Sequence, residues 1–279
     1  TGTNESINRH CGGNDQIKRG GEAMAKRKNE IPPRIFAAAV IKGGTGKTTT
    51  CAALAQAAAA DNKKVLAVDL DPQASFTTAI NGDPNRAGSF ALLTGADAGE
   101  SLQKTAQGIY CIAGGSDLAA IHTKPGSGKR LREALEPIKD NFDFVFIDTP
   151  PTMGELQNNA LQAATDLIIP LEADPDSLQG LYQIADIARH IQRSNAALNI
   201  TGIVLTRYDN RPKLNRYYKD VITQKAQEVN ISFLAAIRQG IAIKEARATR
   251  QSLFEYAPDS NPARDYMKLY EKLTRMANK

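Results

Sequence analysis

The chain has 279 residues, of which 42% are apolar and 23% are charged, and it contains three cysteines. This length is enough for one large core or for two small ones. The mean hydropathy is −0.37 and no stretch approaches 18 uncharged apolar residues, so the sequence predicts no membrane-spanning helix. The odd number of cysteines, without metal-ligand spacing, indicates reduced thiols in a cytoplasmic protein.

The net charge of +5 is distributed unevenly along the chain. Residues 207–279 contain fifteen Lys or Arg and eight Asp or Glu, a net charge of +7, so residues 1–206 carry −2. A basic C-terminal quarter suits a polyanionic partner, although a solvated helical surface has the same composition.

The N-terminal stretch differs from the rest of the chain. Residues 1–33 are polar, rich in Gly and Asn, and lack apolar periodicity, which predicts a disordered tail ahead of a folded domain at 34–279. Lys-Arg-Gly-Gly can be encoded by a purine-rich run like a ribosome-binding site. One hypothesis is therefore that residues 1–23 are translated leader and that the natural start is Met24; the alternative is an authentic tail.

A regular alternation of strands and helices begins at Ile35. Apolar runs predict buried strands at 34–41, 65–71, 110–115, 142–151, 166–172 and 200–209. Helical patterns occupy 46–64, 129–141, 176–193, 213–229 and 262–279. This order predicts an α/β fold with a single doubly wound, mostly parallel sheet and helices on both faces. In such sheets ligands bind at the carboxyl ends of the strands.

The stretch "GGTGKTT" lies between a predicted strand and a predicted helix. Its glycines let backbone N–H groups approach phosphate oxygens, and the helix N-terminus adds a favourable dipole. Lys47 can reach the β- and γ-phosphates and Thr48 can offer its hydroxyl to Mg²⁺. The pattern G-x-x-x-x-G-K-[ST] is not fully met, because its first glycine falls at Ile41, but the strand–turn–helix context supports a phosphate loop.

Three carboxylates follow predicted strands near this loop. Asp148 ends an apolar strand, where it can hold a magnesium-bound water. Asp71 is the last residue of the apolar run 65–71, where the strand ends; in the loop that follows it could position an attacking water, while Asp69 anchors that loop or joins the metal shell. A single Asp at a strand end is most simply a cap, but three of them beside a phosphate loop favour a functional site.

These motifs together resemble a known family. "KGGTGKTTT", "DLDPQAS" and "IDTPPTMGELQNNAL" are similar to the deviant Walker A P-loop ATPases, and the most similar branch is the ParA/Soj DNA-partitioning ATPases. The resemblance runs from about Ile35 to Leu273. It implies an enzyme that hydrolyses ATP with Mg²⁺ and that forms a homodimer when ATP is bound. Lys42, which on its own reads as a solvated lysine, would then reach the nucleotide of the partner subunit.

The resemblance also assigns site residues. The catalytic residues would be Lys42, Lys47 and Asp71. ATP would be bound by Lys42, Gly43, Gly44, Thr45, Gly46, Lys47, Thr48 and Thr49, with turns at Thr206–Arg207 and at Ile237–Arg238 near the adenine. Mg²⁺ would be held by Thr48, and through water by Asp71 and Asp148, with Asp69 as a further candidate.

Non-specific double-stranded DNA is the implied polyanion. By resemblance, basic C-terminal residues of the ATP-bound dimer hold it, and the matching positions are Arg238, Lys244, Arg247 and Arg250. The last three recur at i, i+3 and i+6, which on one helix would form a stripe for phosphate contacts. The resemblance further implies a ParB-like partner that stimulates weak hydrolysis, a nucleoid-associated cytoplasmic location and no membrane contact.

Three alternatives belong to other functional classes. A MinD-like membrane-cycling regulator needs a C-terminal amphipathic helix, and Tyr266, Leu269, Leu273 and Met276 do fall near one face of such a helix; a helix that packs on a sheet has the same pattern. An iron–sulfur ATPase needs paired interface cysteines, and Cys51 and Cys111 offer no pair. A bacterial tyrosine kinase needs a C-terminal tyrosine cluster, whereas the tyrosines here are dispersed.

Overall fold

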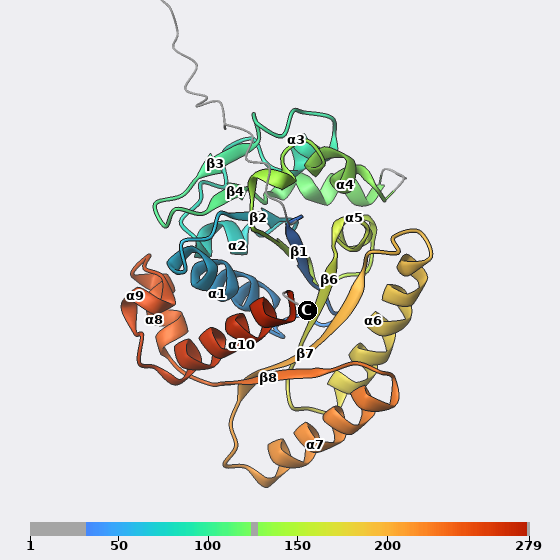
Figure 1. The fold of residues 1–279 in the computed structure, drawn as a ribbon, viewed down its shortest axis with the longest axis vertical. Helices are drawn as coiled ribbons and strands as arrows, with labels where there is room; N and C mark the ends of the chain where they lie inside the picture. Colours follow the sequence, from blue (N-terminus) through green and yellow to red (C-terminus); the bar gives the residue numbers. More distant parts are fainter. Residues whose placement is uncertain (1–31, 124–127, 278–279) are drawn as a thin grey trace, which may run out of the picture.

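The computed structural model describes residues 32–123 and 128–277. They form one eight-stranded sheet in the order β3-β4-β2-β5-β1-β6-β7-β8 (Figure 1). The strands are β1 (Arg34–Ala38), β2 (Val65–Asp69), β3 (Leu102–Lys104), β4 (Tyr110–Ile112), β5 (Phe144–Asp148), β6 (Asp166–Leu171), β7 (Asn199–Tyr208) and β8 (Phe233–Arg238). All neighbouring pairs are parallel except β3 with β4. The predicted fold class is confirmed.

Ten α-helices and two 3₁₀ segments are assigned within the described residues. The helices are α1 (Lys47–Ala60), α2 (Ser75–Ala79), α3 (Ser89–Leu93), α4 (Arg130–Leu135), α5 (Glu155–Ala163), α6 (Asp176–Gln192), α7 (Lys213–Glu228), α8 (Ala242–Ala248), α9 (Leu253–Tyr256) and α10 (Asn261–Ala277). The 3₁₀ segments are Ser116–Thr123 and Lys139–Asn141. The expected disorder of 1–33 and the leader hypothesis fall mostly on residues outside the described part, and both stay predictions.

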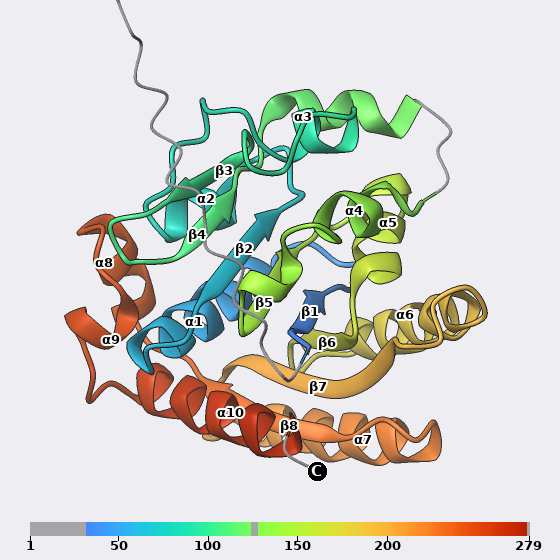
Figure 2. The same cartoon turned by 45° about the horizontal axis from the view of Figure 1, so that its top comes forward.

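The sheet separates two apolar cores because its central strands are buried on both faces. In β1, Ile35 and Ala37 pack into one core, whereas Phe36 and Ala38 pack into the other. The first core is closed by α4, α5, α6 and α7, and the second by α1, α2, α9 and α10. In both views α10 lies beside α1 (Figures 1 and 2). The alternation of side chains along a strand therefore supplies both cores at once.

Helix α1 lies in the second core with ten of its fourteen residues buried. Seven of its residues are alanine, whose small side chain favours the helix and lets it approach the sheet closely. The helix begins directly after Gly46, which has φ +84°. Its N-terminus is therefore held at the carboxyl end of β1, where the phosphate loop was predicted.

Candidate functional site

The loop between β1 and α1 has the backbone geometry of an anion cradle. Gly44 and Gly46 have φ values of +79° and +84°, which a residue with a Cβ adopts only with strain. A Cβ on Gly46 would also lie 3.1 Å from the side chain of Thr206. The Thr206 hydroxyl donates to the carbonyl oxygen of Thr45 at 2.8 Å, so β7 supports the loop from outside. The four N–H groups at the start of α1 face this loop without helical partners of their own.

Lys47 is buried and curls back over the loop. Its Nζ donates to the carbonyl oxygen of Lys42 at 3.1 Å. Burial lowers the pKa of Lys47, although the nearby carboxylates Asp148 and Asp71 oppose this shift. A buried ammonium with one backbone partner retains two further N–H donors, which suits an anionic ligand in the loop.

Thr48 and Asp148 form a pair at the carboxyl end of β5. The Thr48 hydroxyl donates to Asp148 Oδ2 at 2.6 Å. Asp148 is fully buried, and its Oδ1 has no hydrogen-bond partner among the described residues. Burial, reinforced by the charge of Asp69, raises the pKa of Asp148 well above its ordinary value. A divalent cation beside this pair would stabilise the ionised carboxylate and so lower the pKa of Asp148 again.

Asp69 acts on the loop that carries Asp71. Asp69 is buried, and its two oxygens accept hydrogen bonds from the backbone N–H and hydroxyl of Thr77 and from the N–H of Asp71, at 2.8–3.0 Å. Gly114 packs so closely that an added Cβ would lie 2.7 Å from the Asp69 carboxyl carbon. Asp71 lies beyond the end of β2, is partly exposed, and accepts from the N–H of Gln73. In this geometry Asp69 is the anchor and Asp71 is free to face a ligand.

Lys42 does not point into its own loop. Its Nζ donates to Asp174 Oδ2 at 2.7 Å and lies 3.7 Å from Asp176 Oδ2. Burial opposes the charge of Lys42, but the hydrogen bond to Asp174 and the surrounding carboxylates outweigh it, and its pKa is raised. The pKa of Asp174 is lowered, because Lys42 and the Ser177 donors outweigh its own burial. Lys42 is thus held at the rim of the site by acidic residues that come just before and within the first turn of α6.

A cavity of about 550 Å³ opens beside the phosphate loop. It is lined by Thr48 and Thr49 of α1, by the ends of β7 and β8, and by the segment 239–241. The predicted turns at 206–207 and 237–238 are wrong, because both pairs lie inside strands. Both pairs nevertheless line this cavity. Arg207 has φ +50° and donates to Glu172, whereas Arg238 forms a bidentate pair with Asp265.

The three basic residues predicted to form a DNA-binding stripe, Lys244, Arg247 and Arg250, do not lie on one helix. Only Lys244 and Arg247 lie on α8, which ends at Ala248, and both line the cavity just described. Arg250 lies beyond the helix with φ +56°, so the i, i+3, i+6 relation fails there. Arg238 is committed to Asp265. The sequence pattern was misleading because a helical period in a short stretch does not show where the helix ends.

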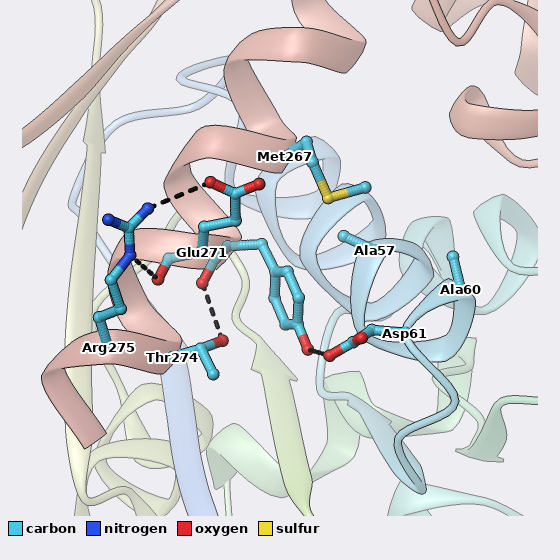
Figure 3. Close-up of a pocket in the computed structure, with 8 residues that line it drawn as sticks. Ala57, Ala60, Asp61, Met267, Glu271, Thr274 and Arg275 are labelled. Atoms are coloured by element: carbon cyan, nitrogen blue, oxygen red, sulfur yellow. Dashed lines mark hydrogen bonds and ion pairs between the residues drawn. The ribbon is translucent and has the colours of Figure 1, made fainter. Parts of the chain in front are cut away.

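A second cavity, of about 470 Å³, lies at the other end of α1 (Figure 3). It is lined by Ala57, Ala60, Asp61, Met267, Tyr270, Glu271, Thr274 and Arg275. The Tyr270 hydroxyl donates to Asp61 Oδ2 at 2.7 Å, and burial together with this bond raises its pKa. Since α1 begins at the phosphate loop and ends here, this cavity is separate from the candidate site.

The residues present fit a magnesium nucleotide. Thr48 uses its proton on Asp148 and keeps its lone pairs for a cation, and the unpartnered Asp148 Oδ1 offers a further oxygen. The described residues contain no group of three or more His, Cys, Asp or Glu side chains able to cage a metal alone. Mg²⁺ is commonly held by one or two protein oxygens together with phosphate oxygens, which agrees with this sparse set.

The sequence motifs predicted most of the residues at this site but missed two residues that hold them in place. No role was predicted for Thr77 or for Asp174, because their roles arise from contacts across the fold. Lys42 and Asp174 are 132 residues apart, so spacing gives no signal of their pairing.

The profile of a family described as an AAA domain matches residues 33–200. The chromosome partitioning protein ParA of Caulobacter vibrioides is 33% identical over 250 residues, which are 85% of this chain and 92% of that protein. The sporulation initiation inhibitor protein Soj of Bacillus subtilis is 30% identical over 257 residues, covering 86% and 98%. Among solved structures, cobyrinic acid a,c-diamide synthase from Mycobacterium smegmatis with a bound ATP analogue and magnesium has a TM-score of 0.76 at 29% identity, covering 88% and 96%.

Proposed function

Because the chain belongs to the ParA/Soj family of partitioning ATPases, we propose that it is an ATP-driven DNA-partitioning switch for plasmid or chromosome segregation. Its ATP-bound dimer holds DNA without reading the sequence. A ParB-like partner stimulates slow hydrolysis and releases the dimer from the nucleoid in the cytoplasm. No helix of the described residues is long and apolar enough to cross a membrane.

In this proposal the chain's own residues have separate tasks. Lys47 and the backbone N–H groups from Gly43 to Thr49 bind the phosphates. Thr48 and, through water, Asp148 hold Mg²⁺, which would neutralise charge on the phosphate oxygens. Asp71 positions the attacking water, and Asp69 keeps Asp71 in place through its hydrogen bonds. We therefore give Asp69 this anchoring role and not that of a metal ligand, because its oxygens already accept hydrogen bonds from protein donors.

The observation that carries the proposal is the position of Lys42. Lys47 alone reaches over the loop, whereas the Lys42 ammonium is held by Asp174 at the rim. A cation at the rim can reach a nucleotide in a second subunit that faces the same edge of the sheet, where it would neutralise developing phosphate charge.

Two alanine variants test this role. Lys42→Ala should bind ATP within about threefold of the wild-type affinity but lose ATP-dependent dimerisation or hydrolysis, because its charge acts only across the interface. Lys47→Ala should lose nucleotide affinity itself, because its charge acts within the subunit. Titration with a fluorescent ATP analogue and sedimentation with Mg-ATP measure the two effects. Normal dimerisation and hydrolysis by Lys42→Ala would overturn the proposal.

Measuring DNA binding with ATP, with ADP and without nucleotide tests the proposed DNA-binding switch. We expect binding with ATP but not with ADP or without nucleotide. If Lys244 and Arg247 of both subunits contact phosphates, affinity should fall about 100-fold between about 50 and about 200 mM salt. Lys244→Glu with Arg247→Glu should abolish it, whereas Arg238→Ala should mainly affect folding, because Arg238 is paired with Asp265. Binding that is independent of nucleotide would contradict the switch.

A further inference from the structure

A third cavity, of about 290 Å³, lies between helices α5 and α6. The two helices lie side by side on the face of the sheet that carries the first core (Figures 1 and 2). Helix α1, which begins at the phosphate loop, lies on the opposite face. This third cavity, which we call the α5–α6 cavity, is therefore separate from the candidate nucleotide site and from the second cavity at the end of α1.

Two buried glutamine side chains of α5 line the α5–α6 cavity. Gln157 is 2% exposed and Gln162 is 5% exposed. Gln157 Nε2 and Gln162 Oε1 have no hydrogen-bond partner among the described residues. Buried polar atoms are nearly always paired in folded proteins, because an unpaired one has lost its bonds to water without replacement. Two unpaired amide atoms that line one cavity indicate that a polar group binds there.

The orientation of the Gln162 amide follows from its neighbour Ser194. Gln162 Nε2 donates to Ser194 Oγ at 2.6 Å, and Ser194 Oγ donates to the carbonyl oxygen of Ile191 at 3.1 Å. Because the serine proton is used on that carbonyl, Ser194 can only accept from Gln162. The amide nitrogen of Gln162 must therefore face Ser194, and its oxygen is the atom left for a ligand.

A third amide, from Asn158, adds a second acceptor. Asn158 also lines the cavity, and its Oδ1 is buried without a hydrogen-bond partner in the described part of the chain. Gly128 packs against Asn158 Nδ2, where an added Cβ would clash, so the nitrogen end of this side chain is covered. The cavity thus offers one donor, Gln157 Nε2, and two acceptors, Asn158 Oδ1 and Gln162 Oε1.

The rest of the lining is partly apolar. Among the described residues that line the cavity there is no Asp, Glu, Lys or Arg, and His190 is the one titratable side chain. Apolar surface comes from Ile187 and Ile191 of α6 and from Met153, just before α5. A permanently charged ligand would find no opposite permanent charge here, and water alone would gain nothing from the apolar walls. A cavity of this volume holds about ten water-sized groups, so a small neutral molecule with an apolar part fits.

One donor and two acceptors on the protein call for a ligand group with one acceptor and two donors. A primary carboxamide is such a group, since it carries one carbonyl oxygen and an NH₂ with two N–H donors. We propose that the α5–α6 cavity binds a small neutral molecule that carries a primary carboxamide. Its NH₂ donates to Asn158 Oδ1 and Gln162 Oε1, and its oxygen accepts from Gln157 Nε2. Its apolar part lies against the two isoleucines of α6.

Benzamide is the probe for this site, because it joins a primary carboxamide to an apolar ring. Ligand-observed NMR titration of the full-length protein, with and without saturating Mg-ADP, should give a dissociation constant of about 1 mM or lower. N,N-dimethylbenzamide keeps the oxygen but lacks both N–H donors, and it should bind at least about tenfold more weakly. No binding of benzamide at about 10 mM would leave water as the occupant and overturn the inference. Equal binding of benzamide and its dimethyl derivative would also overturn it.

Two variants test whether benzamide binds in this cavity. Gln157→Met and Gln162→Met keep the length of the side chain and remove its amide, and each should weaken benzamide binding at least about tenfold. Gln183→Met on α6 is the matched control, because Gln183 is exposed and does not line the cavity, and it should leave binding unchanged. Urea unfolding midpoints equal to that of the wild type would show that the variants remain folded.

Benzamide binding that both variants retain, or that Mg-ADP competes away, would place the probe elsewhere and overturn the inference. The comparison of benzamide with its dimethyl derivative uses only the wild type, so it decides the question even if a variant does not fold. None of these readouts involves ATP hydrolysis, dimerisation or DNA, so the inference can fail while the proposed function holds.

Discussion

Lys42 has two competing positions if it acts across a dimer. In the single subunit its ammonium is paired with Asp174, and both side chains are 28% exposed. Partly exposed ion pairs contribute about 1 kcal/mol or less, so this contact restrains Lys42 without trapping it. Asp174 also accepts hydrogen bonds from the N–H and hydroxyl of Ser177 through Oδ1. A substitution at Asp174 that tests the ion pair must therefore keep this acceptor.

Asp174→Asn keeps the acceptor for Ser177 and removes the charge that holds Lys42. We expect ATP-dependent dimerisation to become up to about 30-fold tighter, because each of the two subunits loses a competing contact of about 1 kcal/mol. Sedimentation over a range of protein concentrations with Mg-ATP measures this. Asp176→Asn is the matched control, since Asp176 is 81% exposed and farther away, and should have a smaller effect. Equal or weaker dimerisation by Asp174→Asn would show that the pair does not compete with the interface.

Asp69 predicts a pH dependence of stability. Burial raises its pKa to about 6 from the ordinary 3.8, against hydrogen bonds from Thr77 and Asp71 that lower it. The folded state therefore holds this proton more tightly than the unfolded chain. The free energy of unfolding should fall by about 3 kcal/mol as pH rises from about 4 to about 6, and the penalty should remain in full at higher pH.

Asp69→Asn should flatten this part of the pH profile in the nucleotide-free protein. Its lost hydrogen bonds lower stability by a similar amount at every pH, so the slope and not the offset is the readout. Urea unfolding of both proteins between about pH 4 and about pH 7 measures it. Identical slopes would mean that Asp69 binds its proton no more tightly in the folded state than in the unfolded chain.

Residues within motifs could be placed from the sequence, but their partners could not. Asp71 was expected in the loop after its strand and lies there, because strand length and alternation are local properties. Thr77 is eight residues from Asp69 and comes close only because α2 folds back over β2. No spacing rule encodes such a contact, which depends on the packed fold.

Helix α10 illustrates how one pattern allows two functions. Its apolar face suggested either packing or membrane contact. In the structure Tyr266, Leu269 and Leu273 are buried in the second core, and the Tyr266 hydroxyl lies 3.3 Å from that of Thr50 in α1. Burial raises the pKa of Tyr266 to about 12. The face that a membrane helix would expose is therefore used by the protein interior, which argues against the MinD-like alternative.

Leu269→Ala should lower the free energy of unfolding by about 2–5 kcal/mol, since it leaves a cavity between α10 and its neighbours. Met276→Ala should change it by less than about 0.5 kcal/mol, because Met276 is 39% exposed. Neither variant should alter sedimentation with anionic vesicles, because we expect the wild type not to bind them with or without ATP. ATP-dependent vesicle binding that Met276→Ala removes would restore the membrane alternative.

Most long elements were predictable from the sequence, as were the short β4 and α4, whereas α5, β8 and several short elements were missed. Strands β1, β2, β5, β6 and β7 are continuous apolar runs, and their alternation is visible along the chain. Strand β8 was missed because only two of its six residues are buried, as expected for an edge strand. The antiparallel β3 has three residues and α9 has four, too few for a periodicity to emerge.

The parallel sheet gathers the candidate machinery at one edge of the molecule. The phosphate loop follows β1, Asp71 follows β2, Asp148 ends β5, and Lys42 lies at the rim. The chain thus has the proposed nucleotide site and the Lys42 ammonium on the same side. Two such edges facing each other about a two-fold axis would complete both sites with the partner's Lys42.

This arrangement predicts complementation between two inactive variants. Lys42→Ala and Asp71→Ala should each be inactive as homodimers. In a mixed dimer, the site of the Lys42→Ala subunit has its own Asp71 and receives Lys42 from the other subunit, so that one site is complete. Random mixing at equal concentrations should therefore restore up to about a quarter of wild-type ATPase activity, since half of the dimers are mixed and each has one working site of two. Mixing Lys42→Ala with a Lys42→Ala, Asp71→Ala double variant is the control and should restore none. If Lys42 acted within its own subunit, neither mixture would gain activity over the separate proteins.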